Sequence, residues 1–140
     1  MRIVLDTSVL VAALRSRRGA SNELLRRVAQ SSLRPLVSTA LFLEYEDVIS
    51  RAEQRLATGM SERDIESFLA ALASACDPVE VHFRWRPQLS DPSDELVLEA
   101  AVNGMADALV THNVRDFQVA AERFDLRVLT PQQCLKEMKP

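Results

Sequence analysis

The sequence predicts an α/β fold: a parallel sheet of about five strands between helices on both faces, a three-layer, Rossmann-like arrangement. The first observation is that short apolar runs alternate with amphipathic stretches of helical period along the whole chain. The second is that most of these runs are continuously apolar, as expected of strands buried on both faces. No repeat, low-complexity segment or linker interrupts the pattern, so we expect residues 1–140 to form a single domain.

The first half of the chain contains two short apolar runs, each followed by helical patterns. Ser21 is a suitable N-cap for one helix, with Leu24, Leu25 and Val28 at helical spacing behind it. Gly59 is expected to end whatever extends the helix that starts near residue 39. The predicted strands are 2–5 and 35–38, and the predicted helices are 9–14, 21–30, 39–51 and 61–76. The two longest helices have apolar stripes made of Leu41, Tyr45, Val48 and Ile49, and of Ile65, Phe68, Leu69, Leu72 and Ala73.

The second half alternates in the same way. Residues 78–83 have a period of 2, which predicts a strand near a sheet edge. Asp91 and Pro92 open a helix that Asn103 and Gly104 close, because proline favours the first helical position and glycine the exit. The apolar run 108–111 predicts a buried strand, 117–124 a helix, 127–129 the last strand, and Thr130-Pro131 the start of a terminal helix.

Composition is that of an ordinary globular protein, with 47% hydrophobic and 26% charged residues. No apolar run approaches the roughly 20 residues of a membrane helix, and Asp6 interrupts the short run at the start, so we expect a cytoplasmic protein without a membrane partner. Cys76 and Cys134 are interpreted as core residues rather than a disulfide.

The net charge of −3 is unevenly distributed. Residues 1–34 contain seven arginines against Asp6 and Glu23, a balance of +5, whereas residues 35–140 have a balance of −8. This asymmetry is compatible with an anionic partner. It is equally compatible with two helices whose arginines are simply solvated.

Asp6 is the first candidate site residue, because it follows the strand 2–5 directly, within Leu5-Asp6-Thr7-Ser8. Ligands of open α/β sheets bind at the carboxyl ends of the strands, so a carboxylate there is placed for chemistry or metal binding. Thr111, His112 and Asn113 follow the strand 108–111 in the same way, and Asp116 lies a turn further on. The alternatives are an exposed His112 without a role and Asn113 as a turn or N-cap residue. Asp107 lies at the opposite, amino end of that strand, and its predicted role is structural.

Two further carboxylates lie on predicted helices. Glu44 flanks an apolar stripe, where a ligand role competes with a side chain that merely reaches solvent. Asp94 shares a helix face with Val97, Leu98 and Ala101; it could be a ligand, or could stabilise the helix start together with Asp91. If Asp6, Glu44 and Asp94 converge on one cleft, their mutual repulsion favours a cation among them. Oxygen ligands select Mg²⁺ or Mn²⁺, a site suited to metal-assisted hydrolysis of a phosphodiester.

At these residues the sequence resembles the PIN-domain family of metal-dependent ribonucleases, over nearly the whole chain. The family's first three acids fall on Asp6, Glu44 and Asp94. Asn113 occupies the place of the fourth acid, as in one branch of the family where an aspartate, here Asp116, follows a turn later. The matching segments are Leu5-Asp6-Thr7-Ser8-Val9-Leu10, Val37-Ser38 with Leu43-Glu44-Tyr45, Asp91-Pro92-Ser93-Asp94 with Leu96, Glu99 and Ala100, Ala106-Asp107-Ala108-Leu109-Val110-Thr111, and Thr111-His112-Asn113-Val114-Arg115-Asp116-Phe117.

The resemblance implies a PIN-like fold and an endoribonuclease that requires Mg²⁺ or Mn²⁺. Its implied catalytic residues are Asp6, Glu44 and Asp94, which would hold the metal with Asn113 and Asp116, while Thr111 would hydrogen-bond the site or a phosphate. Many members are toxins of prokaryotic toxin–antitoxin pairs, which implies an RNA substrate, a small antitoxin protein and a homodimer, with helix 61–76 as a candidate contact surface. Arg15, Arg17 and Arg18 could guide the RNA backbone.

Two other functions are compatible with the sequence. One is a regulatory module that binds RNA or protein and has weak or no catalysis, since Asn113 replaces an acid. The other is a phosphoacceptor domain, which needs a lysine near the last strand. It is disfavoured because the only lysines are Lys136 and Lys139, in the predicted terminal helix.

Overall fold

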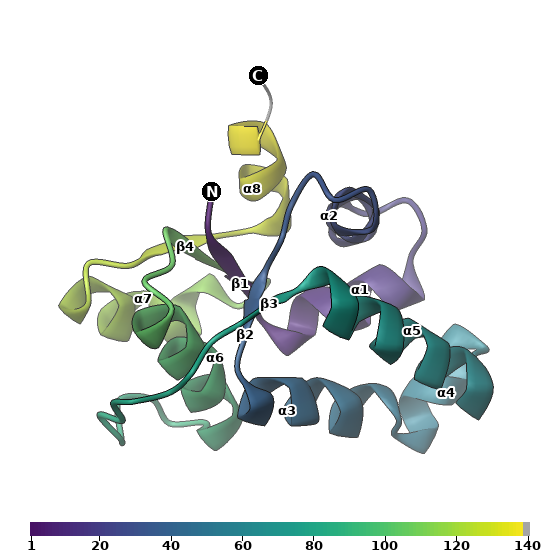
Figure 1. The fold of residues 1–140 in the computed structure, drawn as a ribbon, viewed down its shortest axis with the longest axis horizontal. Coiled ribbons are helices and arrows are strands. Elements are labelled where there is room, and N and C mark those ends of the chain that lie inside the picture. The colour runs from purple at the N-terminus through teal and green to yellow at the C-terminus, as the bar shows by residue number, and fades with distance from the viewer. Residues whose placement is uncertain (139–140) are drawn as a thin grey trace.

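The computed structural model describes residues 1–138, and these have the predicted three-layer α/β architecture (Figure 1). Five strands form one sheet in the order β3-β2-β1-β4-β5, and every neighbouring pair is parallel. The residues of β1 and β4 are all buried, which accounts for their continuously apolar sequences. The strands are β1 (Ile3–Leu5), β2 (Leu36–Val37), β3 (Asp77–Pro78), β4 (Ala108–Val110) and β5 (Arg127–Leu129).

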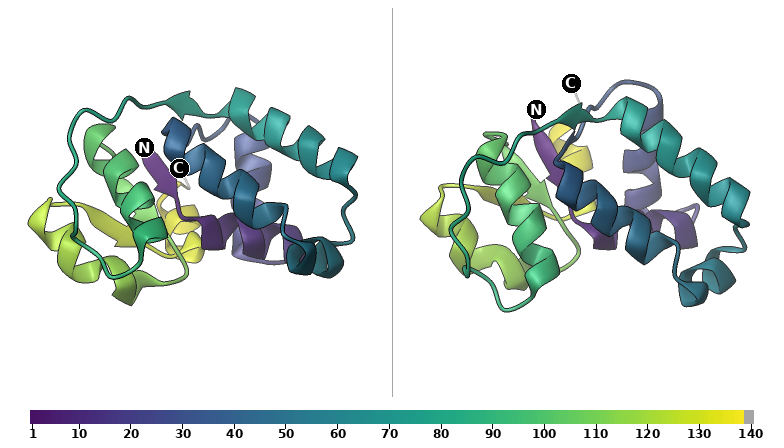
Figure 2. Two further views of the ribbon diagram at one scale, coloured as in Figure 1. Left: turned by 90° about the horizontal axis from the view of Figure 1, so that it is seen from below. Right: turned by 60° about the horizontal axis from the view of Figure 1, so that its bottom comes forward.

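The helices cover both faces of this sheet. Figures 1 and 2 show α6 and α7 on one face and α1, α2 and α5 on the other. Among the described residues, no helix is both long and apolar enough to span a membrane. The helices are α1 (Thr7–Arg15), α2 (Ala20–Ala29), α3 (Thr39–Ile49), α4 (Ala52–Thr58), α5 (Glu62–Ala75), α6 (Pro92–Asn103), α7 (Val114–Arg123) and α8 (Pro131–Met138).

The strand order reverses between β1 and β4 at the centre of the sheet. The chain runs outward from β1 through β2 to β3, then returns across the sheet to β4. Leu5 is paired with Val110, so the two strands end side by side although they are far apart in sequence. In open α/β sheets, ligands bind at this kind of reversal, beyond the carboxyl ends of the strands.

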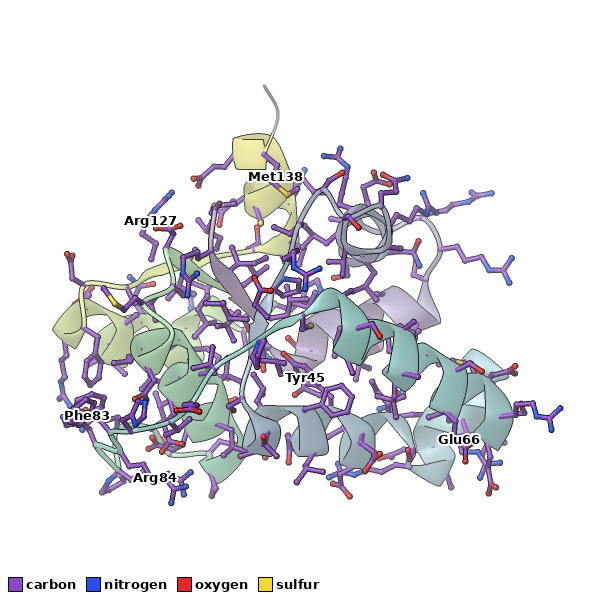
Figure 3. All side chains as sticks on the ribbon, viewed as in Figure 1. Tyr45, Glu66, Phe83, Arg84, Arg127 and Met138 are labelled. Atoms are coloured by element: carbon purple, nitrogen blue, oxygen red, sulfur yellow. The ribbon has the colours of Figure 1, made fainter. Side chains whose placement is uncertain are left out.

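The core lies between the sheet and its helices, and it includes both cysteines. Cys76 and Cys134 are buried and free, as predicted, and burial raises the pKa of each thiol to about 11. Tyr45 of α3 is also buried, and its hydroxyl donates a hydrogen bond to the carbonyl of Leu5 at the end of β1. This bond ties α3 to the strand that precedes Asp6 (Tyr45 is labelled in Figure 3).

The predicted edge strand at residues 78–83 is present as β3, at the edge of the sheet, but its predicted bounds are wrong. β3 ends at Pro78, and residues 79–91, which we call the strap, contain neither helix nor strand. The backbone N–H of Val79 still donates to Val37 of β2, but those of His82 and Phe83 donate to the Asn103 side chain instead of a strand. The period-2 pattern therefore belongs to an extended segment that precedes α6 in sequence and is hydrogen-bonded to its Asn103 side chain.

Several helix boundaries also differ from prediction. α2 begins at Ala20 and its N-cap is Gly19, so Ser21 lies inside the first turn. The predicted helix 39–51 stops at Ile49, because Arg51 adopts an extended backbone conformation (φ −61°, ψ 143°) and starts α4. α1 and α7 begin earlier than predicted, directly after the two central strands. The predicted terminal helix is α8; Lys139 lies outside the described residues.

Candidate active site

Asp6 occupies the point where β1 passes into α1. Its backbone N–H donates to the carbonyl of Val110 at 2.9 Å, and its side chain is only 5% exposed. The hydroxyls of Ser8 and Thr111 both donate to its Oδ2 atom, each at 2.7 Å. Within residues 1–138 no donor bonds to the other oxygen, Oδ1. Asp6 is thus held by one oxygen and has the second available for a ligand.

Thr111 joins the two central strand ends. It is fully buried after β4, and its hydroxyl donates to Asp6 and accepts a hydrogen bond from the Asn113 backbone N–H at 2.9 Å. One side chain therefore fixes the orientation of the carboxylate and the course of the loop that enters α7. The predicted contact of Thr111 with the site is present in this form.

A cleft of about 520 Å³ lies over these strand ends. Asp6, Glu44, Asp94 and Asn113 all line it, from the end of β1, from α3, from the first turn of α6 and from the N-cap of α7. The packing of α3 against α6 brings Glu44 and Asp94 to the same opening (Figure 2). Asp116 is exposed on the first turn of α7 and is not among the lining residues.

The first turn of α6 places Asp94 at the cleft. Asp91 is the N-cap, as expected, and its side chain accepts from the backbone N–H of Ser93 at 2.9 Å, with Pro92 at the start of the helix. This local cap is made by Asp91 alone, because the Asp94 carboxylate has no bond to the cap residue among the described contacts. Asp94 is therefore not engaged in capping and faces the cleft.

The cleft is electronegative around Asp94. Burial, followed by the nearby charges of Asp6, Asp91, Asp116 and Glu95, raises the pKa of Asp94 from its ordinary 3.8 to about 7. A cation placed among these carboxylates would relieve that repulsion. Asp116 thus acts on Asp94 through its charge although it does not line the cleft.

The residues present fit a hard divalent cation in their chemistry. The donors at the cleft are carboxylate and amide oxygens, which favour Mg²⁺ or Mn²⁺ over zinc. Among residues 1–138, however, no group of three or more His, Cys, Asp or Glu side chains is arranged so that it could hold a metal ion. The carboxylates share a cleft without sharing one coordination point, and their role as ligands remains a prediction.

Sequence reasoning missed several polar contacts around the cleft. His112 is exposed, as expected, but its Nε2 atom lies 2.7 Å from the hydroxyl of Ser21, and its backbone N–H donates to Ser8 at 3.3 Å. Ser21 was predicted to cap α2, whereas it is buried and faces this histidine. The contact of Ser8 could have been predicted, because its hydroxyl follows Asp6 by only two residues. No local sequence pattern indicates that Ser21 contacts His112, which is 91 residues away.

Two arginines also line the cleft. Arg15 ends α1 and Arg51 precedes α4, and both are exposed. Arg15 donates to the side chain of Gln54 at 2.9 Å, and Arg51 donates to Asp47 at the same distance. The cleft is thus lined by two guanidinium groups as well as by carboxylates, a combination compatible with an anionic substrate.

Comparison with known proteins agrees with this fold. The family model for the PIN domain matches residues 2–115, which include β1, α3, α6 and β4. No curated protein matches the chain. A chain in the crystal structure of VapBC2 from Rickettsia felis bound to a DNA fragment from their promoter has the same fold, with a TM-score of 0.63 and 17% sequence identity over 93% of this chain and 98% of that chain. Since the family model covers most of its length, the chain belongs to the PIN-domain family.

Proposed function

We propose that this protein is a cytoplasmic endoribonuclease that requires Mg²⁺ or Mn²⁺ and hydrolyses RNA phosphodiester bonds. The observation that carries the proposal is the meeting of Asp6, Glu44, Asp94 and Asn113 in one cleft over the central strand ends. Asp6, Glu44 and Asp94 would hold the metal, with Asn113 and Asp116 completing its surroundings. When bound, the cation supplies Lewis-acid chemistry, activating water and neutralising charge on the phosphate.

The side chains of the cleft have separate tasks in this proposal. Ser8 and Thr111 orient the Asp6 carboxylate through Oδ2, which leaves Oδ1 without a hydrogen bond among the described residues and available to a ligand. Asp94, whose pKa is about 7, would be partly protonated near neutral pH in the metal-free protein. Arg15 and Arg51, which line the same cleft, would bind the RNA phosphates.

The substitution Asp6→Asn tests this proposal. It removes one charge at almost constant volume, so manganese-dependent cleavage of single-stranded RNA should fall at least about 100-fold, as expected when a charge that binds the metal is lost. The matched control is Asp107→Asn, at the amino end of β4, where the carboxylate accepts the backbone N–H of Arg2 at 2.7 Å. The control should retain wild-type activity. Unchanged cleavage by a folded Asp6→Asn protein would rule out the assignment.

We propose further that the protein is the toxin of a toxin–antitoxin pair. The support is the PIN domain itself and the fold shared with a chain of the VapBC2 structure, in which the proteins are bound to DNA of their own promoter. A small antitoxin would occupy the cleft and present a basic side chain to its carboxylates. Co-purification of a small protein encoded next to this one would support the pair. Full ribonuclease activity of the chain expressed alone, without toxicity, would contradict it.

A homodimer is part of the same proposal, with α5 as the contact surface. Ile65, Leu69 and Leu72 of α5 face the core, which leaves the opposite, charged side of the helix at the surface. Light scattering of the purified chain at several concentrations measures the state directly. A constant monomer mass would reject the dimer without affecting the nuclease assignment.

The competing function is a regulatory PIN domain that binds RNA or protein without cleaving. Asn113 favours it, because the neutral amide at this position supplies no charge to a cation. Calorimetric titration with Mn²⁺ separates the two functions. Heat of binding that disappears in Asp6→Asn supports the nuclease, whereas no heat in the wild type supports the regulatory module.

A further inference from the structure

Three of the seven aromatic side chains of the chain form a row on the strap and the end of α7. Phe83 and Trp85 stack with ring centroids 5.5 Å apart and an angle of 27° between ring planes, and Trp85 lies 5.3 Å from Phe124. Phe83 is 62% exposed and Trp85 41% exposed. Large aromatic rings are normally buried, so a preformed row of exposed rings indicates a binding surface.

The start of the strap is fixed by one side chain of α6. The carbonyl oxygen of Asn103 accepts the backbone N–H groups of His82 and Phe83, each at 3.0 Å. Its amide nitrogen donates to the carbonyl of Phe83 at 2.9 Å. Phe83 is therefore held in place by its backbone, which leaves its ring free to contact a ligand.

Two buried glutamates of α6 hold the rest of the strap. Glu99 accepts both guanidinium contacts from Arg86, and Glu95 accepts the backbone N–H groups of Gln88 and Leu89. Glu95, Glu99 and Asn103 recur every four residues, so they form one face of α6. The strap is consequently ordered before a ligand binds, so binding loses little conformational entropy in this segment.

One exposed cation of the strap, Arg84, is available to an anionic ligand. Rings and guanidinium groups alternate in Phe83-Arg84-Trp85-Arg86. Arg84 is exposed and forms no ion pair with any residue of the described chain, and Figure 3 shows Phe83 and Arg84 together at the edge of the molecule. The nearest acid along the strap, Glu80, lies 3.4 Å from His82.

We propose that the strap is a stacking platform for single-stranded RNA, with a base on the ring of Phe83 and a phosphate at Arg84. This deepens the proposed function and rests on it for the identity of the nucleic acid. Alternating rings and cations fit bases and phosphates better than they fit an apolar peptide. Unpaired bases are required, because those of a duplex have no free face to stack on a side chain.

The path of the strap connects this platform to the cleft. It runs along α6 from Asn103 back to Asp91, which lines the cleft beside Asp94 (Figure 1). Asn103, which holds Phe83, lies nine residues after Asp94, a rise of about 13.5 Å along the helix. An RNA strand stacked on the platform would therefore lead toward the cleft over a short distance.

Trp85 provides a direct test, because it is the only tryptophan of the chain. The probe is a labelled, mixed-sequence oligoribonucleotide of roughly 10 nucleotides, added to Asp6→Asn protein, and in parallel to wild-type protein in chelator. Saturable quenching of Trp85 fluorescence by the single strand is expected, with little quenching by the matching duplex. Equal quenching by both, or none by either, would overturn the proposal.

Variants of Phe83 separate stacking from simple apolar contact. Phe83→Ala and Phe83→Leu should each weaken binding of the single strand about 10-fold, measured by anisotropy of the labelled RNA, because both remove the ring. The control Leu56→Ala removes an 86% exposed apolar side chain of α4 and should bind like the wild type. Wild-type affinity of Phe83→Leu would show a generic apolar surface, such as one for a protein partner, and would reject the platform.

These outcomes are independent of cleavage. Loss of affinity in the Phe83 variants supports the platform even if the wild type cleaves no RNA with Mn²⁺, a result that would reject only the proposed nuclease. Cleavage by the wild type together with unchanged affinity in both Phe83 variants would reject only the platform. Circular dichroism of each variant confirms that the comparison is between folded proteins.

Discussion

Asp94 lies where burial and neighbouring carboxylates disfavour a negative charge, which makes folding stability depend on pH. Its pKa is about 7 in the folded protein against an ordinary value of 3.8, so the folded state holds this proton more tightly than the unfolded state. The resulting stabilisation is fully present below about pH 4 and is lost as the pH rises through about 7.

Asp94→Asn should therefore stabilise the metal-free protein at about pH 8, by about 1–2 kcal/mol after allowance for the solvent that reaches this side chain, and much less at about pH 5. Urea unfolding at the two pH values, with Asp107→Asn as the control, measures the difference. The same variant should lose manganese-dependent cleavage. An equal stability change at both pH values would contradict the origin assigned to the pKa shift.

The Thr111 hydroxyl makes two hydrogen bonds at the cleft, one to the Asp6 carboxylate and one from the Asn113 backbone N–H. Thr111→Val keeps the shape but removes the donor to Asp6 and the acceptor of the Asn113 N–H, so it should lower the free energy of unfolding by about 1–3 kcal/mol. Thr111→Ser retains the hydroxyl and should retain manganese-dependent cleavage. Equal activity of the two variants would show that this hydroxyl does not orient Asp6.

At the scale of elements, local signals predicted α6 well. An aspartate cap, a proline at the first position and a closing glycine act within a few residues, and all three occupy these places around α6. The buried strands β1 and β4 were also readable, because burial on both faces requires continuous apolar runs. These parts of the sequence position Asp6 and Asp94, two of the candidate site residues.

The strap shows why the rest could not be predicted. Its alternating pattern resembles a strand, but Trp85 packs against Phe124 at the end of α7, Phe83 stacks on Trp85, and Asn103 accepts the backbone N–H groups of His82 and Phe83. These partners are about 20 to 40 residues away, and no local rule identifies them. The contact between Ser21 and His112 could not be predicted for the same reason. Glu44 and Asp94 line one cleft only because α3 packs against α6, which no local pattern indicates either.

The attachment of the strap to α6 leads to a further prediction. Glu99 is buried and paired with Arg86, so Glu99→Gln should lower the free energy of unfolding by about 1–2 kcal/mol, less than for a fully buried pair because Arg86 is 44% exposed. Glu23→Gln, whose arginine partners lie on the surface of α2, should change it by less than about 0.5 kcal/mol. Chemical denaturation measures both. Equal effects would mean that Glu99 does not hold the strap.

At the scale of the molecule, the sheet gathers residues from across the chain at one edge. The reversal between β1 and β4 places Asp6 beside Thr111, 105 residues later, and α3 and α6 add Glu44 and Asp94 from the flanks. Carboxylates that repel one another in this way destabilise the folded chain unless a cation joins them. The same cation must then bind the folded protein and not the unfolded one, which links metal binding to global stability.

Mn²⁺ or Mg²⁺ should therefore raise the thermal unfolding midpoint of the wild type. At a metal concentration 100 times Kd the stabilisation is about 2.7 kcal/mol, which for a domain of this size corresponds to a rise of roughly 10 °C. Asp6→Asn and Glu44→Gln each remove a proposed ligand and should lose most of this rise, whereas Asp107→Asn, at the opposite end of the sheet, should keep it. Calorimetric scans of the four proteins with and without metal provide the comparison. The same rise in Asp6→Asn as in the wild type would place the cation outside this cleft.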